Sequence, residues 1–253
     1  MRREERHHLK ENPLARAITN VQRALADGGA RTIGVVAAVV VVVLIGGGGY
    51  FAWQSNVADN AGEQLAEALI VLGREVAPPP DDTSEEEWEQ PENTFPSEAV
   101  KLEAVIPQLL AVAEKYPALP AGITARYEAA AALVKLDRLD DAATHYEQVI
   151  AADSGGLHGS MARLGLAETH VLRGDYTGAV ALLEPETESE EPAVPVDAVL
   201  MRIGRAYELA GQDGEALEAF TRVIDEFPFS IYFSQARQRI DALESSTATS
   251  TSG

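Results

Sequence analysis

The sequence contains no cysteine among its 253 residues. This absence excludes disulfide bonds, thiol catalysis, cysteine-linked lipid anchors, and zinc or iron–sulfur sites that require thiolate ligands. Basic residues are also scarce, since 20 lysines and arginines stand against 40 aspartates and glutamates. A formal charge of −20 argues against sequence-independent nucleic-acid binding, which needs a basic surface to displace counterions from phosphates.

Patterns typical of catalysis are missing as well. The sequence has no HExxH, GxSxG, GxxxxGK[ST] or GxGxxG motif. Beyond residue 53 the histidines are His145, His158 and His170, and none of them stands at a metal-ligand or nucleophile–base spacing. We therefore expect no enzymatic activity, no bound metal and no cofactor.

Charge is absent altogether from one long segment. The 27 residues from Thr32 to Ala58 carry none, and Arg31 and Asp59 bound them. About 20 apolar residues in a helix cross a hydrocarbon core of about 30 Å. We expect residues 32–53 to form a single transmembrane helix. A cleavable signal peptide is the alternative, but the region before the apolar run is long and no small-x-small pair follows it cleanly.

The distribution of basic residues predicts the orientation of this helix. Seven lysines and arginines precede it, with four acidic residues, whereas residues 54–253 hold 13 basic and 36 acidic residues, a net charge of −23. Lysine and arginine are retained on the cytoplasmic side of a membrane. We therefore expect residues 1–31 in the cytoplasm and the remainder in the periplasm, anchored in a bacterial inner membrane.

The composition of residues 54–253 predicts three successive segments. We expect a first helical hairpin over residues 54–117, interrupted by a proline-rich acidic loop at 77–96. Residues 118–244 have apolar residues at helical spacing throughout, which predicts helical repeats and a capping helix. Residues 245–253 are rich in serine and threonine, which favours a disordered tail.

Three blocks repeat within the helical region: LDRLDDA, RGDYTGA and AGQDGEA. Their closing residues are Ala142, Ala179 and Ala216, so the period is 37 residues. Each block lies between two stretches with helical periodicity. Self-similarity at this period is typical of solenoid architectures, in which successive hairpins bury each other's apolar faces.

The third repeat shows a large/small packing pattern. Gly204 and Ala216 would let the two helices of the hairpin approach closely, and Pro228 would end the second helix. The residues of this pattern are Leu200, Gly204, Tyr207, Ala216, Phe220 and Pro228. Downstream, Ser230–Leu243 has apolar residues on one side, as expected of a helix that covers the last repeat.

On these residues the sequence resembles the tetratricopeptide repeat (TPR) family. The resemblance implies an all-α fold: one N-terminal transmembrane helix, then a TPR-like α-solenoid of helical hairpins with a C-terminal capping helix. The layout is also similar to the ancillary SecYEG translocon subunit family of bacterial single-pass TPR proteins. That similarity implies protein partners, namely the Sec translocon, periplasmic chaperones or exported clients.

In such arrays a groove lined mainly by first helices takes extended or helical segments of partner proteins. Polar or large residues on the expected first helices are the candidates: Arg126, Tyr127, Arg163, His170, Arg202 and Arg205. Arginines on an acidic domain favour carboxylate ligands. The alternative is that they only solvate the domain and pair with its acidic loops. A second function also stays open, a self-associating homo-oligomeric scaffold of an envelope complex in cell division or outer-membrane assembly.

Overall fold

The computed structural model describes residues 53–80 and 88–251. Nearly all described residues belong to one compact unit, Ala58–Gly253. The predicted cytoplasmic segment and transmembrane helix lie outside the described residues, except for Trp53. Among the helices that the structure does describe, none combines the length and the apolar character needed to cross a bilayer.

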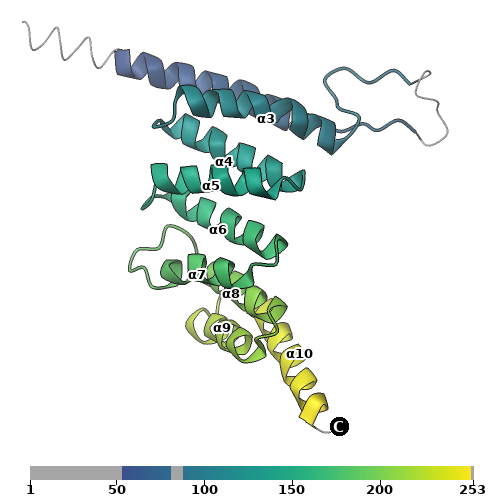
Figure 1. Ribbon diagram of the computed structural model, residues 1–253, viewed down its shortest axis with the longest axis vertical. Coiled ribbons are helices and arrows are strands. Elements are labelled where there is room, and N and C mark those ends of the chain that lie inside the picture. Colours follow the sequence, from purple (N-terminus) through teal and green to yellow (C-terminus); the bar gives the residue numbers. More distant parts are fainter. Residues whose placement is uncertain (1–52, 81–87, 252–253) are drawn as a thin grey trace, which may run out of the picture. The chain divides into compact units, whose positions relative to one another are not determined.

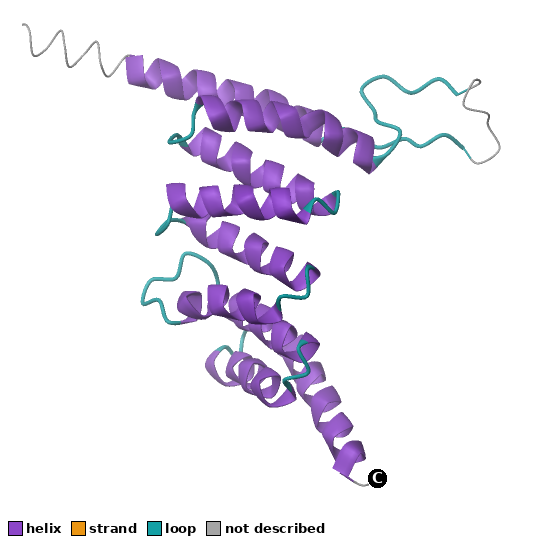
Figure 2. Cartoon of the chain, viewed as in Figure 1, coloured by secondary structure: helices purple, strands orange, loops and turns teal. Residues whose placement is uncertain are grey.

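This compact unit is a succession of helices, each packed on the next in sequence (Figures 1 and 2). A helix over residues 53–72 and α3 form the first hairpin, α4 and α5 the second, α6 and α7 the third, and α8 and α9 the fourth, followed by α10. Their bounds are α3 Glu98–Lys115, α4 Pro120–Lys135, α5 Leu139–Ala152, α6 Leu157–Leu172, α7 Tyr176–Thr187, α8 Val196–Leu209, α9 Asp213–Glu226 and α10 Phe233–Thr251. The predicted all-α hairpin array is confirmed for this part of the chain.

The first hairpin contains the acidic insertion. Its first helix ends at residue 72, where the Gly73 N–H donates to the Leu69 carbonyl at 2.9 Å. Two hydrogen bonds then join the ends of the insertion: Ala77 N–H to the Phe95 carbonyl at 2.8 Å, and Phe95 N–H to the Glu75 carbonyl at 3.0 Å. The insertion at 77–96 therefore has a closed base, after which α3 begins.

The 37-residue period is visible in the backbone between the helices of each repeat. Asp137, Gly174 and Gly211 all have positive φ, at 58°, 78° and 73°. After each, the next residue donates its N–H five residues back, as Arg138 does to Leu133 at 2.9 Å. A left-handed residue followed by this bond closes the carboxyl end of a helix. The sequence repeat is thus a structural repeat of one tight turn.

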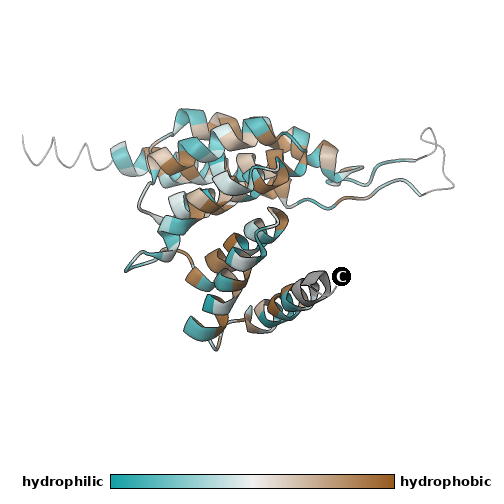
Figure 3. Cartoon of the chain, turned by 60° about the horizontal axis from the view of Figure 1, so that its bottom comes forward, coloured by the Kyte–Doolittle hydropathy of each residue, from teal (hydrophilic) through white to brown (hydrophobic). Residues whose placement is uncertain are grey.

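Among the described residues, three clusters of buried apolar side chains follow one another along the core. The first extends from α3 to α6, the second from α6 to α9, and the third from α8 to α10. Leu182 packs against the first two clusters and Tyr207 against the last two, so neighbouring clusters share contacts. In Figure 3 the helices of the array carry both hydrophobic and hydrophilic stretches, as expected where one side of each is buried.

The residues of the predicted packing pattern lie at helix contacts. Ala142, Ala179 and Ala216 are fully buried, as are Leu200 and Phe220, while Tyr207 is half-buried. A Cβ on Gly204 would lie 2.6 Å from the Phe220 ring, which shows how closely α8 and α9 approach. Pro228 follows the end of α9 at Glu226.

The capping helix differs from its expected bounds at both ends. It begins at Phe233, because Ser230 lies in the preceding turn and donates its hydroxyl to Asp197 of α8 at 2.6 Å. It continues to Thr251, so the backbone is helical over most of the segment for which composition favours a disordered tail. Buried Ala236 and Leu243 fix the helix on the last repeat.

Candidate interaction groove

One groove lies where the first helices of the last two repeats meet the capping helix. It encloses about 230 Å³ and is lined by Glu168 of α6, Met201, Arg202 and Arg205 of α8, Phe220 of α9, and Tyr232, Gln235 and Arg239 at α10. Glu168, Arg202 and Arg205 also line a smaller hollow that extends between α6 and α8. The groove therefore brings together residues from two repeats and the cap.

Arginine side chains give this groove its charge. Arg202 and Arg205 are exposed and lie about one turn apart on α8. Arg202 donates to the Ala198 carbonyl of its own helix at 3.1 Å, and Arg205 makes no hydrogen bond or ion pair with any described residue. Arg239 donates to Glu208 at 3.2 Å. With Glu168 as the single carboxylate in its lining, the groove is locally basic within a strongly acidic domain.

Tyr127, a predicted groove residue, lies on α4 and packs against the first core cluster, outside the lining of this groove. Its ring packs edge-to-face against Tyr146 with 5.7 Å between centroids. Burial raises the pKa of Tyr127, the Glu128 carboxylate acts in the same direction, and the positive charge of Arg202 opposes both.

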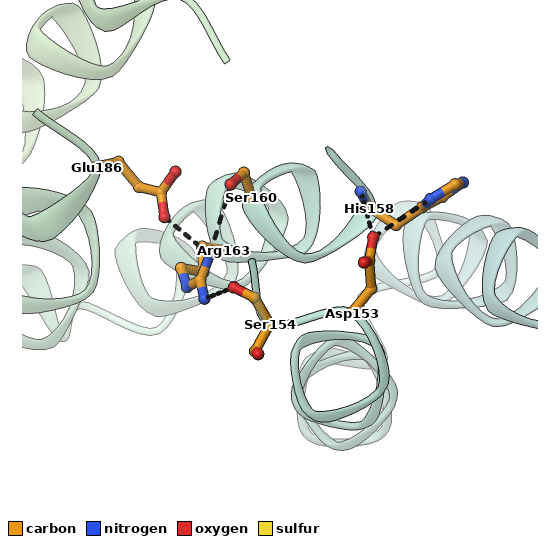
Figure 4. Close-up of polar contacts among 6 residues, drawn as sticks. All are labelled: Asp153, Ser154, His158, Ser160, Arg163 and Glu186. Atoms are coloured by element: carbon orange, nitrogen blue, oxygen red, sulfur yellow. Dashed lines mark hydrogen bonds and ion pairs between the residues drawn. The ribbon is translucent and has the colours of Figure 1, made fainter. Parts of the chain in front are cut away.

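Two predicted groove arginines bind within the array instead. Arg126 donates to the Ala113 carbonyl of α3 at 3.1 Å and also to the Gln148 side chain of α5. Arg163 donates to Glu186 at 2.8 Å, with side-chain exposures of only 18% and 10%, and it also binds Ser160 and the Ser154 carbonyl (Figure 4). Both guanidinium groups therefore connect neighbouring helices.

The histidines likewise bind neighbouring residues. His170, a predicted groove residue, lies 2.7 Å from Asp175 across the α6–α7 turn. The Gly178 N–H, and after it the His170 ring, lower the pKa of the Asp175 carboxyl. His158 lies 3.0 Å from Thr124 and 3.5 Å from Asp153, whose carboxylate also accepts the His158 N–H (Figure 4).

His145 is half-buried on α5. Burial, and secondarily the charge of Arg126, lower its pKa. No group of three or more histidine, aspartate or glutamate side chains in residues 53–80 and 88–251 is arranged to hold a metal ion.

The opposite side of α8 carries a second groove that the sequence reasoning missed. It encloses about 160 Å³ and has Leu200, Ile203 and Ala219 in its lining, together with the carboxylates of Glu184, Glu215 and Glu218 and a single arginine, Arg222. The Tyr207 hydroxyl donates to Glu184 at 3.3 Å. The two sides of α8 therefore differ in charge, basic toward α10 and acidic toward α7 and α9.

Parts of this chain are similar to known proteins. Two family models match, both described as tetratricopeptide repeat, over residues 127–186 and 198–230. MamA, whose crystal structure is known, shares 15% sequence identity with this chain. The two structures match with a TM-score of 0.47 over 59% of this chain and 80% of MamA. Kinesin light chain TPR-like repeats from Podosopora anserina share 18% sequence identity with this chain. That structure matches with a TM-score of 0.44 over 61% of this chain and 90% of the other. A tetratricopeptide repeat protein from Parabacteroides merdae shares 14% sequence identity with this chain. Its structure matches with a TM-score of 0.45 over 58% of this chain and 55% of the other. No curated protein matches the chain.

Proposed function

We propose that this chain, a tetratricopeptide repeat protein, is a membrane-anchored interaction module that holds its repeats on the extracytoplasmic side of a bacterial inner membrane. Tetratricopeptide repeats typically bind proteins and do not catalyse reactions. In this proposal the groove between α6, α8 and α10 binds an acidic segment of a partner. The partners are the Sec translocon, periplasmic chaperones or emerging envelope proteins.

The observation that carries the proposal is the pair of exposed arginines in the groove. Arg205 has no partner among the described residues, and Arg202 has only a carbonyl of its own helix. Guanidinium groups bind carboxylates with two parallel hydrogen bonds, and such charged bonds contribute about 1.5–3 kcal/mol each. An acidic segment of a partner therefore matches the groove, whereas a basic segment is repelled there.

Anchoring is supported by the sequence. The 27 uncharged residues from Thr32 to Ala58 are long enough for one span, and seven basic residues precede them. Labelling of single cysteines in intact cells tests the orientation directly, because the native chain has no cysteine. A cysteine at position 12 should resist a membrane-impermeant maleimide, and one at position 248 should react. The reverse pattern would refute the orientation.

The groove is tested by charge reversal in the full chain at native expression, followed by cross-linking and mass spectrometry. The variant Arg202→Glu/Arg205→Glu should lower recovery of translocon or chaperone partners at least about tenfold, since each lost charged bond contributes more than 1.4 kcal/mol. Arg237→Glu is the matched control, an exposed arginine of α10 that does not line the groove. Equal recovery with both variants would refute the groove. A stable oligomer that captures no such partner would instead favour the scaffold function.

A further inference from the structure

The turn that follows the second helix of a hairpin occurs three times with the same backbone. Tyr116, Asp153 and Phe227 end α3, α5 and α9 with φ of −130°, −139° and −129° and ψ of 51°, 53° and 61°. In each turn the carbonyl of this residue accepts the N–H three residues later, from Leu119, Gly156 and Ser230. The three turns are therefore structural equivalents.

Their side chains differ sharply at one exposed position. Two residues after the helix end stand Ala118, Gly155 and Phe229. A Cβ on Gly155 would meet no atom within 4 Å, so this position points into open solvent. Since the turn forms with alanine or glycine, it does not require a phenylalanine. Phe229 is 99% exposed and Ile231 is 87% exposed, so neither contributes packing to the described fold.

The backbone that carries these two side chains is fixed. Between them lies Ser230, whose hydroxyl donates to Asp197 of α8 at 2.6 Å and accepts the Tyr232 N–H at 2.9 Å. The Ser230 carbonyl also accepts the Phe233 N–H at 3.1 Å. Phe229 and Ile231 therefore project from a segment attached to the last repeat at both sides. Preorganised apolar side chains lose little conformational freedom on binding, which is typical of anchor residues at protein interfaces.

We call the segment that presents these two exposed side chains the Phe229–Ile231 tip. Its neighbouring charges and its exposed area identify the kind of surface that it fits. The nearest charged residues in sequence, Asp225 and Glu226, are both acidic, although Glu226 already pairs with Arg222 at 2.7 Å, and no lysine or arginine lies between Arg222 and Arg237. An anionic bilayer surface is therefore disfavoured. Two apolar side chains expose roughly 350 Å², below the about 800 Å² per partner of a stable interface, so two tips packed together are too small for a dimer.

We propose that the Phe229–Ile231 tip is a second docking site, separate from the groove, that inserts into an apolar pocket with basic side chains at its rim on another protein. A pocket surrounds the phenyl ring on all sides and so buries more area than a flat contact. The basic rim would face the exposed Asp225, adding charge complementarity. The tip does not depend on Arg202 or Arg205 for its partner.

Photo-cross-linking in native membranes tests this inference. The photoreactive residue p-benzoylphenylalanine is placed at position 229 of the full chain, with position 118 as the matched control on the equivalent turn. We expect adducts at 229 in large excess over 118, on a protein whose cross-linked residues line an apolar pocket rimmed by lysine or arginine. Adducts with lipid, with a second copy of the chain or with a polar surface would overturn the proposal, and so would no excess over position 118.

Binding measurements with the partner so identified complete the test. Phe229→Ala should raise the Kd about 10- to 100-fold, and Phe229→Leu by less, because leucine retains most of the apolar area. Helix content should be unchanged in both, as alanine occupies the equivalent position of the first turn. The variant Arg202→Glu/Arg205→Glu should retain the adduct at 229, so failure of the groove and failure of the tip are distinguishable. An unchanged Kd for Phe229→Ala would refute the anchor role.

Discussion

Alanine at position 204 should destabilise the protein, although alanine is the better helix former. A Cβ on Gly204 would lie 2.6 Å from Cε1 of Phe220 and 2.8 Å from Cδ1 and Cζ. That ring has 1% of its surface exposed, so it has no open space into which to move. Overpacking in a well-filled core costs about 1–3 kcal/mol, which exceeds or cancels the roughly 1 kcal/mol gained from helix propensity.

A matched variant separates the clash from the propensity. Gly62 lies in the helix over residues 53–72, is exposed, and has no atom within 4 Å of the position of a Cβ. Gly62→Ala should therefore stabilise the protein by about 0.5–1 kcal/mol. Because both variants gain the same propensity, the difference between their free energies of unfolding isolates the packing cost. We expect this difference to be about 1–3 kcal/mol in favour of Gly62→Ala.

The assay is urea unfolding of the full chain in detergent, followed by helical circular dichroism. A second substitution, Phe220→Leu, removes the ring and should make Gly204→Ala less costly in that background, so the two changes are coupled. If Gly204→Ala were as stabilising as Gly62→Ala, the close approach of α8 and α9 would be refuted.

Three further predictions concern the polar contacts and turns. Removing one partner of the largely buried Arg163–Glu186 ion pair, with Arg163→Met or Glu186→Gln, should cost about 2–3 kcal/mol in urea unfolding, because the remaining charge loses its partner. The double variant should cost less than the sum, since it leaves no unpaired charge. The Gly178 N–H holds the pKa of Asp175 below its ordinary value, so this contribution is complete above about pH 4 and is lost as pH falls through the folded-state pKa. Asp175→Asn should flatten that acid limb when unfolding is measured at successive pH values. Gly174→Ala should cost about 1 kcal/mol because φ is 78° there, and unchanged stability would contradict the left-handed turn.

The helical hairpins could be predicted from sequence because each is specified locally. The alanines at 37-residue spacing lie at buried helix contacts. The residue five positions before each alanine has the left-handed backbone conformation of the turn. Pro228 follows the end of α9 as expected. Small residues at close contacts and helix-ending residues act within one hairpin, so their effect is visible in a short stretch of sequence.

The groove could be predicted only in part, because side-chain partners come from other repeats. Spacing places Arg163 and Arg202 alike on first helices, yet Arg163 is buried against Glu186 while Arg202 is exposed. Glu186 lies in the acidic run at residues 184–192, whose composition alone favours a solvated loop, but α7 extends to Thr187 and the Glu186 side chain is buried. Arg239 lines the groove because of how α10 packs on the last repeat, and no local sequence pattern specifies that packing.

The order of the helix contacts has a consequence for how the protein is made. The principal contacts join helices that are consecutive in sequence, with α4 and α6 as the exception. A chain with such local contacts has a low contact order and folds rapidly. Each repeat therefore has most of its own packing partners within about 40 residues. As the chain emerges from a ribosome or a membrane channel, one hairpin can fold before the next is available, and it then serves as the surface on which that next hairpin forms.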